Sequence, residues 1–274
     1  MMRVSLRLRL GLKRTRSRAP GCVVLVDVDG DGRLDVVTAS SSDDTIAWYK
    51  NEAGSPPTWT PYTISTTADF ARGVFAADLD DDGRVDVVSG SSHDDRVMWY
   101  KNGGGSPPTW TPYTISTVAD GVFTVFATDF DGDGRVDVLS ACQSNDQVVW
   151  YKNSGGSPLA WTPFTVTSTA DGAAAVFVAD LDGDGRKDVL SGNFNDGNIA
   201  WHKNSLCAAG QYGVGGAAPC MGCPEGTYGA TSGLTSAACT GACTAGFYCP
   251  PASTRGTQVP ALVMQYAVHP PCRL

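Results

Sequence analysis

Short runs of apolar residues alternate with polar turns along most of the chain. In one copy of this pattern the runs span 73–77, 87–90, 97–100 and 110–115, and each is bounded by Gly, Pro, Ser or Asp. Short runs rich in Val, Ile and aromatic residues, with turn residues between them, indicate β-strands. The pattern predicts four strands per unit, and it recurs in units near 21–70, 71–121, 122–172 and 173–204.

The predicted strands are apolar on both faces. Met98 and Tyr100 are as apolar as Val97 and Trp99, although alternate residues of a strand point to opposite sides. A sheet of this kind is covered on both faces. Tryptophan also recurs at two repeat positions, which hold Trp48, Trp99, Trp150 and Trp201, and Trp59, Trp110 and Trp161. Four strands per unit with periodic aromatics are typical of propeller blades.

We therefore predict an all-β fold, a β-propeller of four visible four-stranded blades, followed by a small disulfide-rich module. The fourth unit runs into a cysteine-rich tail before any fourth strand. The chain either closes as a four-bladed ring, with residues 3–10 supplying the missing outer strand, or forms an arc of a larger propeller.

An aspartate-rich loop follows the first strand of every unit. In the second unit it is Asp-Leu-Asp-Asp-Asp-Gly-Arg-Val-Asp (78–86), and the starting aspartates recur at a constant spacing of 51 residues (27, 78, 129 and 180). Each copy has Asp at positions 1, 3, 5 and 9 and Gly at position 6. Calcium takes six to eight oxygen ligands, and Gly permits the sharp turn that gathers them. The loops predict four calcium sites.

The expected calcium ligands are the four aspartates of each loop and the carbonyl of its seventh residue. The loop is similar to the start of an EF-hand loop but has no flanking helical pattern and no Glu at position 12. Asp81 occupies position 4, where the other loops have Gly, and we expect it to point to solvent. The predicted ligand residues are Asp27, Asp29, Asp31, Arg33, Asp35, Asp78, Asp80, Asp82, Arg84, Asp86, Asp129, Asp131, Asp133, Arg135, Asp137, Asp180, Asp182, Asp184, Arg186 and Asp188.

The pattern Asp-x-Asp-x-Asp-Gly-x-x-Asp-Val, followed by a run ending Trp-Tyr-Lys-Asn, resembles FG-GAP/VCBS repeats. These form calcium-binding blades of integrin-alpha-like propellers, and the resemblance covers residues 21 to about 204. It implies calcium in each loop between the first and second strands, and a role in cell adhesion or ligand binding.

The loops between the second and third strands, with those that join one blade to the next, would lie on the face opposite the calcium loops. Loops on a rigid scaffold are common binding sites, although plain solvated turns are an equal alternative. The candidate ligand-face residues are Asp43, Asp44, His93, Asp94, Asp95, Arg96, Asn145, Asp146, Asn195 and Asp196, and the blade-joining loops add Asp69, Asp120 and Asp171.

Charge bears on the partner class. The chain has 274 residues, a net charge of -8 and 28 acidic residues, of which 17 are aspartates in the four loops. Nucleic acid is therefore an unexpected partner for the folded part. Residues 1–20 are basic and lack the apolar core of a secretory signal. They are an outer strand, a transit-like segment or the start of an incomplete sequence, and no segment of the chain is apolar enough to cross a bilayer.

Residues 205–274 form a separate cysteine-rich segment. Cys-Pro-Glu-Gly-Thr-Tyr-Gly (223–229) and Thr-Ala-Gly-Phe-Tyr-Cys-Pro (244–250) resemble ephrin-receptor-like cysteine-rich repeats, which are small EGF-like modules stabilised by disulfides. Zinc is the alternative, because the spacing of four of the cysteines approximates a four-Cys site. The disulfide candidates are Cys207, Cys220, Cys223, Cys239, Cys243, Cys249 and Cys272, while Cys22 and Cys142 are expected to be free thiols.

These features favour a non-enzymatic, extracellular or cell-surface calcium-binding protein with a protein or glycan ligand. No nucleophile–base motif or phosphate-binding loop is present, and the three histidines do not recur at the repeat period. Two alternatives stay open, a carbohydrate-binding propeller and an accessory domain of a secreted hydrolase.

Overall fold

A computed structural model describes residues 21–205 and, in the tail, residues 211–212, 221–223, 227–228, 239–242, 247–248, 252, 254–255 and 259–260. These residues form strands and turns without any helix. No helix of the described part is therefore long and apolar enough to cross a membrane. The predictions for residues 1–20 lie outside the described residues.

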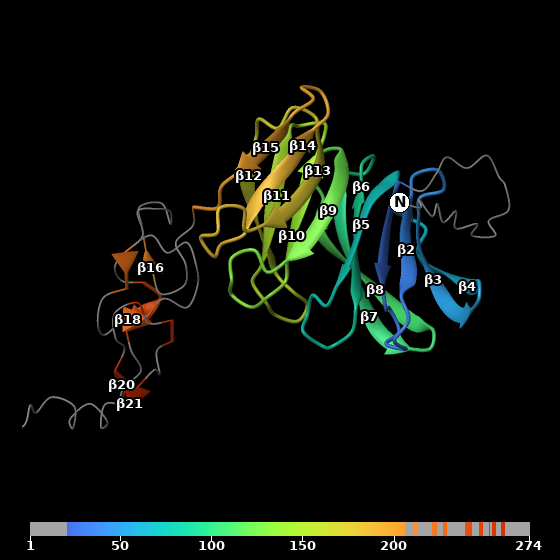
Figure 1. The fold of residues 1–274 in the computed structure, drawn as a ribbon, viewed down its shortest axis with the longest axis horizontal. Helices are drawn as coiled ribbons and strands as arrows, with labels where there is room; N and C mark the ends of the chain where they lie inside the picture. The colour runs from blue at the N-terminus through green and yellow to red at the C-terminus, as the bar shows by residue number, and fades with distance from the viewer. Residues whose placement is uncertain are drawn as a thin grey trace, which may run out of the picture. The chain divides into compact units, whose positions relative to one another are not determined.

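The fold is all-β and propeller-like, and each repeat unit forms one antiparallel sheet. The strands within a sheet follow the order of the chain (Figure 1). The first sheet contains β1 (Cys22–Val26), β2 (Asp35–Ser40), β3 (Thr45–Gly54) and β4 (Pro57–Ser65). The second contains β5 (Ala71–Ala77), β6 (Asp86–Ser91), β7 (Arg96–Gly105) and β8 (Pro108–Ser116).

The third sheet contains β9 (Val122–Thr128), β10 (Asp137–Cys142), β11 (Gln147–Asn153) and β12 (Trp161–Thr167). The fourth sheet has three strands among the described residues, β13 (Ala173–Ala179), β14 (Asp188–Asn193) and β15 (Ile199–His202). The predicted strands of the four units are thus confirmed, and the described residues 173–205 of the fourth unit form three strands.

The chain divides into two compact units. One contains residues 1–127, 136–176 and 191–200, and the other contains 128–135, 177–190 and 201–274. In the first unit, the sheet β5–β8 lies between the sheets β1–β4 and β9–β12 (Figure 1). Both of its faces are therefore covered, as the apolar pattern predicted.

Two apolar clusters hold these three sheets together. In the first cluster, Ile46 and Trp48 of the first sheet pack with Val74 of the second sheet. In the second cluster, Val97 and Trp99 of the second sheet pack with Val125 of the third sheet at the corresponding repeat positions. The first two sheets thus present the same repeat positions to the sheet that follows. Burial of these apolar side chains is the main contribution to the stability of the sheet packing.

An aromatic residue of the outer strand covers each core tryptophan. Trp48 stacks on Tyr62 with ring centroids 4.8 Å apart. Trp99 stacks on Tyr113 at 4.7 Å, and Trp150 packs on Phe164 at 4.8 Å. Cross-strand aromatic pairs of this kind stabilise a sheet by roughly 0.2–1 kcal/mol each.

The described parts of the tail are short two-stranded ladders. β16 (Gln211–Tyr212) pairs with β17 (Met221–Gly222), β18 (Thr227–Tyr228) with β19 (Gly241–Ala242), and β20 (Phe247–Tyr248) with β21 (Val259–Pro260).

One disulfide, between Cys223 and Cys239, joins two of the predicted bridge cysteines. It removes both from the four-Cys zinc set that spacing had left open. The other five candidates, Cys207, Cys220, Cys243, Cys249 and Cys272, lie outside the described residues. Cys22 and Cys142 are free, as expected.

Candidate metal centres

Each aspartate-rich loop forms a tight turn between the first two strands of its sheet. In the first loop, Gly30 and Gly32 have φ of 74° and 83°, in the left-handed region that glycine adopts without strain. Asp81 has φ 62° at the position equivalent to Gly30 and is exposed to solvent, as predicted.

The first aspartate organises the turn. Oδ1 of Asp27 accepts hydrogen bonds from the backbone N–H of Gly30 at 2.9 Å and of Asp31 at 3.1 Å, and Oδ2 accepts from Gly32 at 2.7 Å. In the second loop, Asp78 accepts from Gly83 at 2.8 Å. These hydrogen bonds fix the orientation of the first carboxylate within the turn.

Three carboxylates converge in every loop. Positions 1, 3 and 9 each offer an oxygen atom, and the three oxygens lie within 4.8 Å of one another. These sets are Asp27, Asp29 and Asp35; Asp78, Asp80 and Asp86; Asp129, Asp131 and Asp137; and Asp180, Asp182 and Asp188. Hard oxygen ligands of this kind suit calcium or magnesium rather than zinc or copper.

The third position leaves buried oxygen atoms unused. Oδ1 of Asp29 and Oδ1 of Asp80 are buried and have no hydrogen-bond partner. Such an orphaned acceptor costs roughly 1–3 kcal/mol unless something binds it. A cation between the three carboxylates would satisfy these atoms, so the residues present fit a calcium ion.

A lysine in or just after the third strand partly neutralises three of the four clusters. Lys50 donates hydrogen bonds from Nζ to Asp29 and, at 2.7 Å, to Asp31. The bond to Asp29 raises the pKa of Lys50, and the bond from Lys50 lowers the pKa of Asp31. Lys101 and Lys203 bind the equivalent aspartates of the second and fourth loops. The sequence analysis missed this role, although the lysine recurs within Trp-Tyr-Lys-Asn.

The ninth position is the most buried ligand. Oδ2 of Asp35 accepts hydrogen bonds from the backbone N–H of Val28 at 3.2 Å and from Nε1 of Trp48 at 2.9 Å, while Oδ1 accepts from Asn51 N–H at 2.8 Å. In the second loop, burial raises the pKa of Asp86 to about 6, although the backbone N–H groups of Asn102 and Leu79 oppose that shift.

Buried asparagines connect the loops of neighbouring blades. Asn102 donates from Nδ2 to the carbonyls of Val28 in the first loop, at 3.3 Å, and of Val85 in the second, at 3.0 Å. Asn153 bonds in the same way to the Leu79 carbonyl at 3.0 Å. A hollow of about 310 Å³ lies beside Asn102, between the first two loops. These hydrogen bonds therefore link the backbone of each of these loops to the next blade.

The fifth-position aspartate stays a predicted ligand, and in the first loop it contacts two basic residues. Asp31 is not among the three converging carboxylates and instead pairs with Lys50 and Arg33. Arg33 also donates from Nε to the carbonyl of Asn51 at 2.8 Å, which fixes the loop on the third strand. The structure shows no contact that tests the seventh-position carbonyl as a ligand.

Most of the predicted ligand-face residues lie in the turns after β2, β6, β10 and β14, whereas Arg96 begins β7 and Asp69, Asp120 and Asp171 lie in the loops between sheets. Three of them have a structural role. Oδ1 of Asp44 accepts a hydrogen bond from Phe70 N–H at 2.9 Å, Asp95 accepts from Gly121 at 3.1 Å, and Asp146 accepts from Gly172 at 2.8 Å. Each ties its turn to the loop that leads into the next blade.

Among the remaining ligand-face residues, His93, Arg96 and Asn195 are exposed, whereas Asp94 is partly buried. Arg96 lies 3.6 Å from Asp94, and His93 lies 3.4 Å from Asp69. The His93 ring also stacks on Phe70 with centroids 4.2 Å apart. In the fourth unit, Asn195 donates to Asp171 at 2.8 Å.

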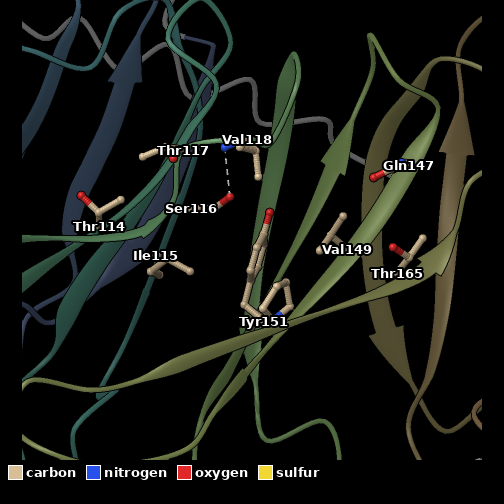
Figure 2. A pocket seen from close by; sticks show the side chains of 10 residues that line it. Thr114, Ile115, Ser116, Thr117, Val118, Gln147, Val149, Tyr151 and Thr165 are labelled. Carbon is tan, nitrogen blue, oxygen red and sulfur yellow. Dashed lines mark hydrogen bonds between the residues drawn. The ribbon is translucent and has the colours of Figure 1, made fainter.

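A groove of about 430 Å³ lies between the outer strand of the second sheet and the third sheet (Figure 2). Thr114, Ser116 and Thr117 line one side, and Gln147 and Val149 of β11 lie on another. Figure 2 shows Tyr151 between Ser116 and Ile115 on one side and Val149 and Thr165 on the other. Sequence reasoning missed this groove because its walls come from different repeat units.

The family follows from the repeat itself. A model of the FG-GAP-like repeat matches residues 27–89, 78–140 and 129–191, which together cover more than half of the chain and contain all four aspartate loops. The chain belongs to the FG-GAP-like repeat family. A comparison with curated proteins finds no significant match.

Two solved structures resemble this FG-GAP-like protein in fold. The V. cholerae biofilm matrix protein is 20% identical, with a TM-score of 0.39 over 76% of this chain and 34% of its own. The chain thus spans about a third of that protein. An Agrocybe aegerita lectin, described as recognising non-reducing terminal N-acetylglucosamine, is 18% identical, with a TM-score of 0.46 over 89% of this chain and 68% of its own.

Proposed function

We propose that this FG-GAP-like protein binds calcium in its four loops and uses the resulting rigid blades to bind an extracellular protein or glycan. The observation that carries the calcium proposal is the convergence of three carboxylates at the same positions of each loop. The unpartnered buried oxygens of Asp29 and Asp80 support it further.

Calcium would act here as a structural ion. Three carboxylates within a few ångströms repel one another unless a cation or a proton compensates the charge. The lysine at each of three clusters supplies one positive charge. A calcium ion supplies two charges and joins the turn to both strands that flank it.

Equilibrium dialysis against radioactive calcium tests this proposal. We expect about four ions per chain and dissociation constants on the order of 10⁻⁴–10⁻³ M, as in other extracellular calcium modules. Asp80→Asn should remove one ion. The matched control Asp81→Asn changes an exposed aspartate in the same loop and should remove none. Equal calcium loss in both variants would contradict the assignment.

The adhesion or ligand-binding role is proposed as non-enzymatic. The repeated blades form a scaffold with loops that vary between units, and the Cys223–Cys239 disulfide is consistent with an oxidising compartment. Arg96→Ala should weaken binding of a partner to the candidate face. Asp95→Ala is less suitable, because its carboxylate holds the loop at Gly121. Turnover of generic glycosidase or esterase substrates would instead favour the hydrolase alternative.

Glycan binding is the second candidate, and the groove in Figure 2 favours it. Its hydroxyl and amide side chains surround apolar Val149, and this mixture suits the polar and apolar faces of a sugar ring. Val149→Met would fill the groove with the residue that the second unit carries at the same position, Met98. The exposed Thr111→Met is the control.

A glycan array probed with and without chelator tests whether the groove binds a glycan. We expect signals that Val149→Met reduces and Thr111→Met leaves unchanged. No glycan signal from the wild-type chain in calcium would contradict the glycan candidate while leaving the calcium sites untouched.

A further inference from the structure

The first strand of the first sheet exposes apolar side chains on one face. Residues of β1 alternate between half-buried and exposed, and Val23 and Leu25 are 58% and 61% exposed. The same repeat position as Val23 holds Val74 in the second sheet and Val125 in the third, which are 2% and 5% exposed. The residue at this position is apolar in all of these sheets, but only in the first sheet is it exposed to solvent.

The last strand of the fourth sheet is exposed in the same way. Ile199 and Trp201 are two residues apart on β15, so they point to the same side, and they are 78% and 51% exposed. Their repeat equivalents are buried in the other sheets. These equivalents are Ile46, Val97 and Val148 for Ile199, and Trp48, Trp99 and Trp150 for Trp201.

The inner sheets show what covers such positions. In the second apolar cluster, Val97 and Trp99 pack with Val125 of the following sheet. In the first cluster, Ile46 and Trp48 pack with Val74. In both clusters, the residue equivalent to Val23 therefore packs with the residues equivalent to Ile199 and Trp201.

The two exposed sets are thus the two halves of one interface that the chain already forms twice. We propose that β1 of one copy of this chain packs against β15 of a second copy, and so rebuilds the sheet-to-sheet contact that its inner blades make. The occupant of the Val23 and Leu25 surface is a second copy's Ile199 and Trp201 surface.

Such a contact is heterologous, because the two surfaces come from different parts of the chain. Heterologous contacts close into a ring when the rotation allows it and otherwise extend into a filament. Burying these four side chains removes apolar surface from water, at about 25 cal/mol per Å². Assembly should therefore depend on protein concentration and should persist at high salt.

Sedimentation velocity of the full chain in calcium, over a range of micromolar concentrations, measures the assembly. We expect the wild type to sediment as a dimer or larger species as concentration rises. Leu25→Lys and Ile199→Lys each place a charge in the interface, and each variant alone should remain monomeric. Leu34→Lys is the matched control, because Leu34 is 58% exposed in a loop and the fourth unit carries Lys187 at that position.

Mixing the two interface variants tests the head-to-tail arrangement. Each keeps one intact surface, so an equimolar mixture of Leu25→Lys and Ile199→Lys should form a one-to-one dimer and nothing larger. A symmetric contact between two β1 surfaces would instead leave Ile199→Lys dimeric by itself, and that result would overturn the proposal.

Two further results would also overturn it. One is a wild-type chain that stays monomeric at every concentration, as expected if another segment of the same chain covers either surface. The other is assembly that Leu34→Lys disrupts as strongly as Leu25→Lys does. Circular dichroism melts establish that each variant is folded, and either interface variant alone suffices if the other does not fold.

Discussion

Trp48 donates a hydrogen bond from Nε1 to Oδ2 of Asp35, 2.9 Å away. Both side chains are fully buried. Asp35 is one of the three converging carboxylates of the first loop, and Trp48 belongs to the apolar cluster between the first two sheets. The carboxylate cluster is therefore in direct contact with the core of the blade.

This contact predicts an optical signal for calcium. A cation on Asp35 withdraws charge from the oxygen that Trp48 contacts, so the indole emission should change as calcium binds. Trp48→Phe should remove more of the calcium-dependent fluorescence change than Trp59→Phe, since Trp59 lies at the end of the first sheet, opposite Asn51. Equal losses in a calcium titration of the two variants would contradict the coupling.

Lys101 should compete with calcium for the second loop. Its ammonium group binds Asp80 and, at 2.8 Å, Asp82. Each partly exposed ion pair contributes about 0.2–1 kcal/mol, so Lys101→Met should tighten calcium binding at this loop by about two- to fivefold and lower the melting temperature in chelator. Arg96→Met removes the same charge on another loop and is the control. Calorimetric titration measures both, and weaker calcium binding in Lys101→Met would count against the idea.

The backbone of Phe70 should be conformationally strained. It has φ 56°, whereas Gly121 and Gly172 occupy the same repeat position with φ 66° and 69°. A left-handed conformation costs a non-glycine residue roughly 1–2 kcal/mol. Phe70→Gly and Phe70→Ala both lose the ring contacts with His93 and Arg72, but only glycine relieves the strain. Phe70→Gly should therefore unfold at higher urea than Phe70→Ala, and the reverse order would refute the assignment of strain.

Cys142 should be the less reactive of the two free thiols. It is fully buried, and burial raises the pKa of its thiol to about 11, while Cys22 is only half-buried. Only the thiolate reacts, so the folded chain at pH 8 should take up iodoacetamide at Cys22 well before Cys142. Peptide mass spectrometry checks this order. Labelling of Cys142 at a rate equal to that in urea would show that the third sheet opens readily.

Much of the fold could be predicted because the repeat is regular. Strands, loops and blade boundaries recur at one spacing. A boundary that is ambiguous in one unit can therefore be predicted from the equivalent positions of the others. The three converging carboxylates followed from the same spacing. The pairing of the fifth-position Asp31 with Lys50 was not predicted, because Lys50 comes from the third strand. Asp31 as a calcium ligand stays a prediction.

The features that could not be predicted from the sequence depend on contacts between residues far apart in the chain. Lys50 reaches Asp29 because β2 pairs with β3 in a particular register, which brings Val36 opposite Tyr49. Asn102 of the second blade donates a hydrogen bond to the Val28 carbonyl of the first blade. The Lys and Asn of Trp-Tyr-Lys-Asn recur visibly in the sequence. No local sequence pattern, however, predicts which residues they contact.

Thermal melts of the full chain in calcium, in magnesium and in chelator test the central claim most directly. One site with a dissociation constant on the order of 10⁻⁴–10⁻³ M contributes about 1–2 kcal/mol at about 2 mM calcium. Four sites together should raise the melting temperature by several degrees, and magnesium should do so poorly because it keeps its waters.

The same melts on two variants assign the effect to the loops. Asp80→Asn should reduce the difference between the calcium and chelator melts, and Asp81→Asn should preserve it. Identical melting temperatures in calcium, magnesium and chelator would contradict calcium binding by the whole repeat.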